Sequence, residues 1–124
     1  MMTEPAADAP ATLHRGDVVW AAPDPAVGRE QAGRRPAVIV SSAGHLALAT
    51  RLVFVVPVTS VERGWPNHVA LRGRTLTLTD PSFAMTEQLK TIDRARIQRL
   101  AGQVDQATMT AIDRWVADFL DLAR

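Results

Sequence analysis

The sequence predicts a mainly β fold, a small antiparallel β-barrel with one helix packed on it at the C-terminal end. Continuous apolar runs such as Ala37-Val38-Ile39-Val40 lie between loops rich in glycine and proline, which is typical of buried strands. The long amphipathic pattern comes last, over residues 105–122, where apolar side chains recur at helical spacing. Strands first and a helix last favour a small antiparallel barrel with that helix packed on it.

The expected elements follow one another with loops between them. Pro23 and Pro25 end the first strand, and Pro57 indicates that the third strand leaves the sheet near that residue. Asp105 is expected to cap the final helix. The expected strands are 17–21, 35–41, 52–58, 68–71 and one bent strand over 82–86 and 88–92, with short helical turns expected in 42–50 and in the polar segment 93–99, and with 75–79 unassigned.

Length and composition limit the class of protein. At 124 residues we expect a disordered tail over 1–13 and a single domain over 14–124. No stretch approaches the roughly 18 apolar residues of a membrane helix, and the N-terminus does not resemble a signal peptide. The absence of cysteine excludes disulfides, thiol catalysis and cysteine-ligated metals, and suits a cytoplasmic protein.

Charge is unevenly distributed, although the net charge is only +1. Residues 29–99 contain 11 basic and 5 acidic side chains, whereas the segments on either side are acidic. A basic middle predicts a local anionic partner, such as nucleic acid or an acidic peptide. Ordinary solvated charge produces the same pattern, so this observation alone is weak.

The loop at residues 28–36 places basic groups directly before a predicted buried strand. It contains Arg29, Arg34 and Arg35, and Pro36 biases Arg35 towards an extended backbone. A guanidinium presents a planar fork of donors that suits phosphate. The alternative is a solvated loop with surface arginines, and the residue types alone leave the two interpretations evenly balanced.

Several motifs follow one another in an order that is more specific than any single motif. They are Gly16-Asp17-Val18-Val19-Trp20, Asp24-Pro25, Glu30-Gln31-Ala32-Gly33-Arg34-Arg35-Pro36-Ala37-Val38-Ile39-Val40, Val56-Pro57-Val58-Thr59-Ser60, Arg63-Gly64-Trp65-Pro66 and Glu87-Gln88-Leu89-Lys90-Thr91-Ile92-Asp93. Over roughly residues 15–122 the chain resembles the MazF/PemK-type toxins, the endoribonuclease halves of type II toxin–antitoxin pairs. The resemblance implies the SH3-like barrel of the MazF/CcdB superfamily, in agreement with the strand pattern.

The resemblance also implies an activity, namely sequence-specific and metal-independent cleavage of single-stranded RNA that inhibits translation and growth and needs no cofactor. The ribose 2′-OH would attack the adjacent phosphorus and leave a 2′,3′-cyclic phosphate and a 5′-OH. The matching positions imply that Arg35 and Thr59 form the catalytic pair. Because a guanidinium stays protonated, we expect Arg35 to stabilise the phosphorane rather than to act as a base. The ordinary alternative for Thr59 is a turn residue.

Further side chains are candidate contacts to RNA. Trp65 is suited to stacking on a splayed base, and the glutamine that matches Gln88 in the family lies near bound RNA. Glu30 is equally well explained as an exposed carboxylate paired with an arginine. The full set of candidates is Glu30, Gln31, Arg34, Ser60, Arg63, Trp65 and Gln88.

The remaining ring side chains have ordinary interpretations. His14, His45 and His68 have no ligand-like spacing, so no metal site is expected. His68 is interpreted as a solvent-exposed strand residue in preference to a proton shuttle. Trp20 and Trp115 are expected to pack in the core.

The resemblance implies two protein partners: a second copy of the chain, with a long groove along the homodimer interface, and a MazE-like antitoxin whose acidic, disordered tail fills that groove. Two alternatives remain open. One is a non-catalytic barrel toxin that acts on a protein target, as CcdB-type gyrase poisons do; the other is an RNA-binding module without activity. The pairing of Arg35 with Thr59 favours the nuclease, since a protein-binding module does not need it.

Overall fold

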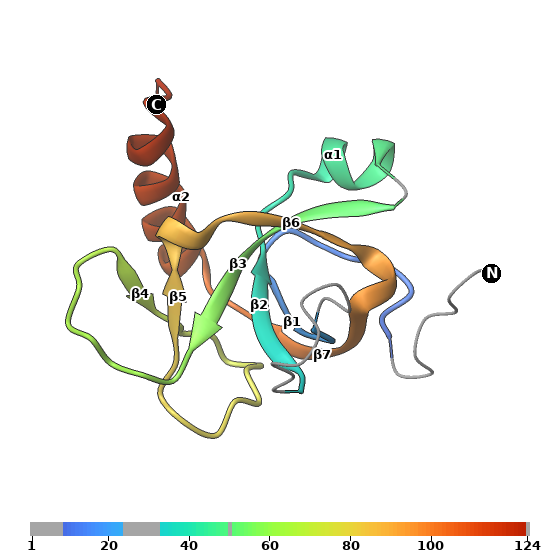
Figure 1. Cartoon of the computed structure of the whole chain (residues 1–124), viewed down its shortest axis with the longest axis horizontal. Helices are drawn as coiled ribbons and strands as arrows, with labels where there is room; N and C mark the ends of the chain where they lie inside the picture. Colours follow the sequence, from blue (N-terminus) through green and yellow to red (C-terminus); the bar gives the residue numbers. More distant parts are fainter. Residues whose placement is uncertain (1–8, 24–32, 50, 124) are drawn as a thin grey trace.

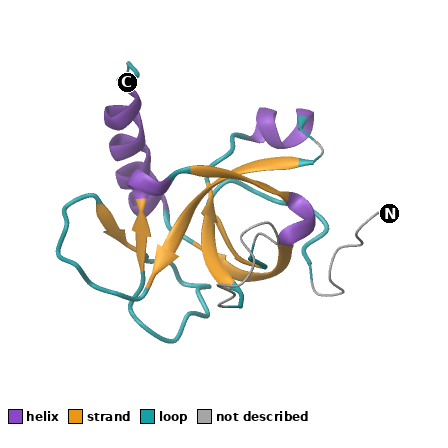
Figure 2. Ribbon diagram, viewed as in Figure 1, coloured by secondary structure: helices purple, strands orange, loops and turns teal. Residues whose placement is uncertain are grey.

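A computed structural model describes residues 9–23, 33–49 and 51–123 of the chain. A seven-stranded sheet forms its body, and one long helix stands at its C-terminal end (Figure 1, Figure 2). None of the described helices is long and apolar enough to cross a membrane. The elements are β1 (Asp17–Ala21), β2 (Arg35–Ile39), α1 (Ala43–Leu48), β3 (Leu52–Thr59), β4 (His68–Ala70), β5 (Phe83–Met85), the 3-10 helix η2 (Thr86–Gln88), β6 (Lys90–Asp93), the 3-10 helix η3 (Arg94–Arg96), β7 (Ile97–Gln103) and α2 (Gln106–Leu120).

The central strand is β3, which pairs antiparallel with three others. Its first half pairs with β6, its middle with β2 and its end with β5. The strand order is β4-β5-β3-β2-β1-β7, with β6 beside β3. Across the described part of the chain no ladder joins β6 to β7, so the barrel is not fully closed. The predicted fold class, antiparallel β with a C-terminal helix, is confirmed.

Strand β1, the end of β2 and the second half of β3 are buried on both faces, which agrees with their continuous apolar runs. The barrel interior contains Leu13, Val19, Ala21, Ala37, Ile39, Val53, Val55, Ile92 and Ile97. The opposite face packs against α2 and contains Val18, Val38, Val56, Val58, Ala84, Ala101, Met109 and Ile112. Because side chains alternate along a strand, Arg35 and Thr59 belong to the rows that face the barrel interior.

Most of the expected elements are present. A short helix, α1, lies within residues 42–50, and η2 interrupts the predicted bent strand at Glu87 and Gln88. Asp105 caps α2 by accepting a hydrogen bond from the backbone N of Thr108 at 2.8 Å. The prediction of a polar segment with a helical turn over residues 93–99 is wrong after Arg96, because strand β7 begins at Ile97. This strand pairs with β1 with two breaks in register, so its sequence lacks a clean alternation.

Three hydrophobic side chains differ from their expected positions. Leu13 is buried in the barrel interior, so the packed domain includes the last residue of the predicted tail. Trp115 is only partly buried, because the second half of α2 extends beyond the sheet (Figure 1). For the same reason Phe119 is 50% exposed despite its place in the helical apolar pattern. Trp20 does pack against the cluster under α2.

Candidate functional site

Arg35 and Thr59 lie on neighbouring strands at one end of the barrel. The ladder between β2 and β3 ends at the pair Ala37 and Pro57, two residues short of Arg35 and of Thr59. Beyond it Arg35 pairs with Ala21 of β1, and Thr59 pairs with Phe83 of β5. Figure 1 shows the end of β3 diverging from the start of β2.

Pro57 determines where β3 changes partners. Proline has no N–H to donate, and the ladder with β2 ends at this residue. The next two residues, Val58 and Thr59, pair instead with Ala84 and Phe83 of β5. The sequence-based prediction that β3 leaves its first sheet near Pro57 is therefore confirmed.

The Thr59 hydroxyl is held in place by the chain that follows it. The backbone N of Val61 donates to Thr59 Oγ1 at 3.1 Å. This hydrogen bond uses the oxygen as an acceptor, so the O–H remains available as a donor. Thr59 therefore has the turn role that its residue type suggests and also a hydrogen that it can donate to a ligand.

The arginines enter β2 from a turn. Gly33 has a φ of +82°, a conformation that favours glycine, and it precedes Arg34 and Arg35 directly. Both guanidinium-bearing residues are exposed, and Arg35 pairs through its backbone with Ala21 of β1. The predicted contacts Glu30 and Gln31 lie outside the described residues.

The loop at residues 60–67, which follows Thr59, exposes three of the predicted RNA contacts, Ser60, Arg63 and Trp65. The Arg63 guanidinium carbon lies 5.7 Å from the centroid of the Trp65 ring, within cation–π range. Trp65 is 49% exposed, so half of its surface remains accessible. The loop thus presents a cation and an aromatic ring beside the Arg35–Thr59 end of the barrel.

His68 is buried, and the expectation of a solvent-exposed histidine is wrong. Its side chain is 2% exposed, and its Nε2 lies 3.1 Å from both carboxylate oxygens of Glu87. The Asn67 side chain also donates to Glu87 Oε1, at 2.8 Å. Sequence reasoning missed this pair because the two residues are far apart in the chain and meet only through the pairing of β4 with β5, which η2 follows directly. The signal in the sequence was the Glu87-Gln88 motif, because it places a carboxylate directly beside the glutamine that is expected to contact RNA.

Gln88 ends η2 and is exposed, as a base-reading amide must be. Its Nε2 lies 3.6 Å from Met85 Sδ, a weak contact that a stronger acceptor can replace. The predicted contacts therefore form two groups, Arg34 and Arg35 with Thr59 and Ser60 at the barrel end, and Trp65 with Gln88 near η2. The loop at residues 60–67 connects them.

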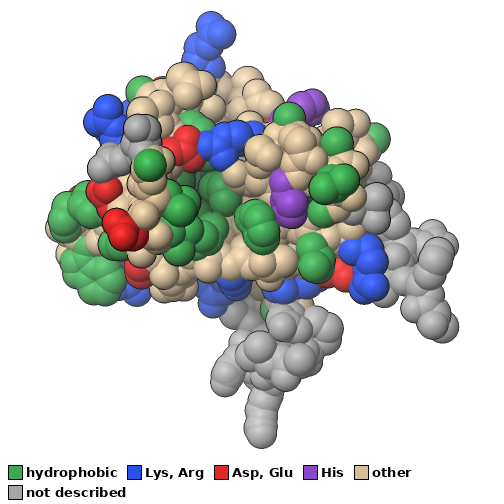
Figure 3. All heavy atoms as spheres, turned by 90° about the horizontal axis from the view of Figure 1, so that it is seen from above, with side chains coloured by type: hydrophobic (Ala, Val, Ile, Leu, Met, Phe, Trp, Pro, Cys, Tyr) green, Lys and Arg blue, Asp and Glu red, His purple; other side chains and the backbone are tan. Residues whose placement is uncertain are grey.

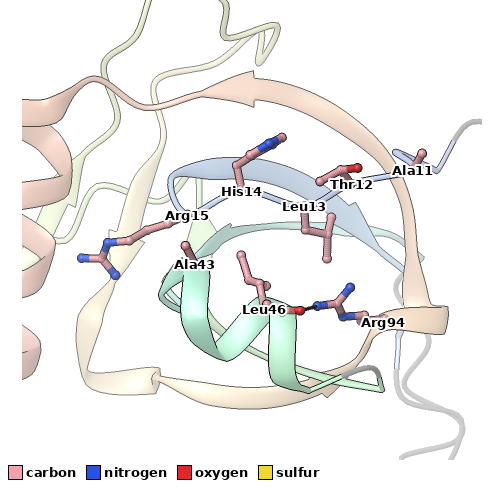
Figure 4. A pocket seen from close by; sticks show the side chains of 9 residues that line it. Ala11, Thr12, Leu13, His14, Arg15, Ala43, Leu46 and Arg94 are labelled. Atoms are coloured by element: carbon pink, nitrogen blue, oxygen red, sulfur yellow. Dashed lines mark hydrogen bonds between the residues drawn. The ribbon is translucent and has the colours of Figure 1, made fainter.

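Other parts of the surface do not gather site residues. In the part of the chain that the structure describes, no group of three or more His, Asp or Glu side chains is placed to hold a metal ion. A cavity of about 340 Å³ lies between residues 11–15, α1 and Arg94 (Figure 4). There Arg94 Nη2 donates to the Leu46 carbonyl at 2.6 Å, and none of the predicted site residues lines the space.

Known proteins resemble this chain in both sequence and fold. The family model described as "PemK-like, MazF-like toxin of type II toxin-antitoxin system" matches residues 14–120. The chain is 36% identical over 115 residues to "Endoribonuclease MazF9" of Mycobacterium tuberculosis, covering 89% of this chain and 98% of that protein.

Solved structures agree with the sequence match. MazF from Deinococcus radiodurans superposes with a TM-score of 0.74 at 24% identity, over 91% of this chain and 100% of that one, a likeness of fold. An "Endoribonuclease in complex with its cognate antitoxin" from a mycobacterial species superposes with a TM-score of 0.70 at 26% identity, over 93% and 99%. The chain therefore belongs to the family of PemK-like, MazF-like toxins of type II toxin–antitoxin systems.

Proposed function

We propose that this chain is a sequence-specific, metal-independent endoribonuclease that cuts single-stranded RNA by attack of the ribose 2′-OH. RNA cleavage is the activity for which its relative from Mycobacterium tuberculosis is named. The observation that supports the chemical part of the proposal is that Arg35 is exposed at the start of β2, while Thr59 ends the neighbouring strand β3 with a hydroxyl hydrogen that it can donate. Inhibition of translation and growth follows from the destruction of cellular RNA.

The two side chains suit the charge that develops during such a cleavage. As the 2′-oxygen attacks, negative charge accumulates on the non-bridging oxygens of the phosphorane. Arg35 supplies a permanent positive charge with several donors, and Thr59 supplies one hydroxyl donor, so both stabilise this charge. The 2′-OH proton must also leave and the 5′-oxygen must gain one; Glu30, five residues before Arg35 in the sequence, is the carboxylate that we propose for the first transfer.

The exposed groups around the pair suit an unpaired RNA strand. Trp65 has free ring surface for stacking, Gln88 has an amide that can read a base edge, and Arg63 adds positive charge. In an RNA helix the base edges are paired and the bases are stacked, so these contacts require single-stranded RNA. The competing interpretation, a gyrase poison like CcdB, is favoured only if purified protein leaves RNA intact and inhibits supercoiling.

Replacing the ribose on the 5′ side of the scissile bond by deoxyribose should abolish cleavage but preserve binding. The substitution removes the attacking oxygen and leaves the phosphates and bases unchanged. Cleavage and affinity are measured in EDTA on matched oligonucleotides with and without the 2′-OH. Efficient cutting of the deoxy substrate, or loss of all activity in EDTA, would indicate a metal-activated water instead.

We also propose that the acidic tail of a MazE-like antitoxin occupies the RNA-binding surface, because both ligands are extended and anionic. Arg63→Glu should then weaken both ligands, whereas Arg51→Glu should weaken neither. Arg51 is a matched control, since it is exposed and precedes β3 at the end opposite Thr59. A competition titration with the deoxy RNA checks this; simultaneous binding of both ligands would exclude a shared surface.

The homodimer that we propose uses the overhanging end of α2. Phe119, Leu120 and Leu122 are 50%, 53% and 57% exposed, and Figure 3 shows hydrophobic side chains gathered between this end of the molecule and α1. Patches of this kind on a soluble protein are typical of interfaces. Phe119→Asp should shift sedimentation equilibrium towards the monomer, and Thr110→Asp, an exposed position in the first half of α2, should not. Equal dimer content in both variants would contradict this placement.

A further inference from the structure

A hydrogen-bonded network lies beneath the loop at residues 60–67, and the proposed cleavage mechanism makes no use of it. His68 is its centre, with a side chain that is 2% exposed. Its Nε2 meets the Glu87 carboxylate at 3.1 Å, and the same carboxylate accepts from Asn67 at 2.8 Å. Thr86 completes the network by donating its hydroxyl to the Asn67 carbonyl at 2.6 Å. The network therefore joins the end of the loop to η2.

The hydrogen bonds determine the orientation of the His68 ring. Nδ1 is buried and has no hydrogen-bond partner within the described residues, whereas Nε2 faces a carboxylate. A proton on Nε2 satisfies the carboxylate, so the ring donates from Nε2 in its neutral as well as its charged form. Partial burial raises the pKa of Glu87, but hydrogen bonds, chiefly the one from His68, lower that pKa by a larger amount. The pKa of Glu87 is therefore below its usual value, and Glu87 stays ionised. The ring is consequently held in one position.

The ring that is held in this way is the one that contacts Trp65. The centroids of the two rings are 4.8 Å apart, with the planes tilted by 55°. The backbone N of His68 also donates to the Trp65 carbonyl at 3.0 Å, closing a turn over Pro66 and Asn67. Trp65 is thus an exposed side chain in a glycine-containing loop. The ring that it contacts on its inner side, that of His68, is held in one position.

The imidazole of this pair is buried, whereas the carboxylate of Glu87 is partly exposed to solvent. Because water screens a partly exposed charge, the attraction between the two groups adds little to the stability of the loop. What the pair does provide is direction, because hydrogen bonds specify angles and apolar contacts do not. The side chain that gains a defined direction here is Trp65.

We propose that His68 and Glu87 are positioning residues that hold Trp65 in place to stack on an unpaired base of the RNA substrate. The inference rests on the proposed ribonuclease function and deepens it. It assigns to Glu87 an effect on substrate affinity that is transmitted through His68 and Trp65. The network lies outside the Arg35–Thr59 pair, so the rate of the chemical step should change little when it is broken.

The test is a double-mutant cycle between Glu87→Ala and Trp65→Ala, read as affinity for the deoxy form of the mapped RNA site. Loss of a base–aromatic stack weakens binding by about tenfold or more, so we expect each single variant to bind about tenfold more weakly. The double variant should be within about twofold of Trp65→Ala alone, because Glu87 acts through Trp65. KM should rise with affinity loss while kcat stays within about twofold of wild type.

Conservative and control variants separate positioning from general stability. Glu87→Gln keeps an oxygen that accepts from both His68 and Asn67, so it should restore most of the affinity. Glu62→Ala removes an exposed carboxylate from the same loop and should bind like wild type. Asn67→Ala removes a single hydrogen bond and should give a smaller loss in the same direction, which keeps the test valid if Glu87→Ala does not fold. Additive losses in the cycle, or no rescue by glutamine, would overturn the proposal.

A second readout needs no RNA and so does not depend on the proposed function. The emission of Trp65 is isolated as the difference between wild type and Trp65→Phe. Glu87→Ala should shift this emission to the red, towards that of a solvated indole, and Glu87→Gln should leave it unchanged. If wild type cuts no RNA but this shift occurs, the proposed function fails and the positioning network stands. If cleavage occurs and the emission of Glu87→Ala is unchanged, the network is wrong.

Discussion

Arg35→Ala and Thr59→Ala should each reduce RNA cleavage by about 10²–10³-fold, which corresponds to about 2.7–4 kcal/mol of barrier for one lost donor to a developing oxyanion. The lower limit is expected for Thr59, which contributes one neutral hydroxyl. The larger loss is expected for Arg35, whose guanidinium is charged and forks towards two oxygens. Both residues lie at strand ends and neither is part of a core cluster, so the fold should survive.

The measurement is single-turnover cleavage of a mapped RNA site, with circular dichroism and thermal unfolding to confirm the fold. Arg51→Ala and Thr91→Ala are matched controls, because both are exposed and lie away from the end of β3 that carries Thr59. Affinity for the deoxy RNA should fall much less than the rate, since the lost interactions strengthen in the transition state. Near wild-type turnover by a folded Arg35→Ala protein would remove Arg35 from the catalytic pair.

Gly102→Ala should destabilise the domain by about 3 kcal/mol, combining backbone strain with a steric clash. Gly102 has a φ of +105°, in the region that side chains rarely adopt. A Cβ there would lie 2.3 Å from the Thr75 carbonyl oxygen and 2.8 Å from the Leu76 Cα. These are backbone atoms, and the backbone N of Thr77 also donates to the Ala101 carbonyl at 3.0 Å, so the segment cannot move away freely.

Urea and thermal unfolding measure this effect. At about 4 °C for each kcal/mol, Tm should fall by about 12 °C. Gly44→Ala is the control, because Gly44 lies in α1 without a positive φ and the nearest atom to an added Cβ is Ser42 Oγ at 3.9 Å. That variant should be neutral or stabilised by up to about 1 kcal/mol. Equal stability of Gly102→Ala and wild type would show that the close approach of residues 75–77 to β7 is not a constraint.

The sequence predicted the strands with the strongest apolar character because tertiary packing and local pattern agree there. Residues 55–58 are apolar because this part of β3 is buried on both faces, and β1 and the end of β2 share that position. Leu52 and Phe54, at the start of β3, are 47% and 43% exposed. The end of the first sheet at Pro57 and the cap at Asp105 were also predictable, because each depends on the covalent chemistry of one residue.

Strand β7 was not predictable in the same way. It pairs with β1 through two register breaks, contains a glycine with positive φ and exposes Arg99 and Leu100. These irregularities remove the alternation of apolar and polar residues that is typical of a strand, so the local sequence pattern indicated only a polar segment. Pairing with β1, which is more than seventy residues away in the chain, supplies the backbone hydrogen bonds that make it a strand.

By itself, then, the sequence determined the fold class, the apolar strands, the family and the identity of the residues proposed to cut RNA, because these depend on residue types and their order. Only the tertiary structure decided which side chains meet. It turned His68 from an expected surface residue into the buried partner of Glu87. The physical reason is that such contacts join side chains brought together by strand pairing, and pairing is a property of the folded chain that no local pattern contains.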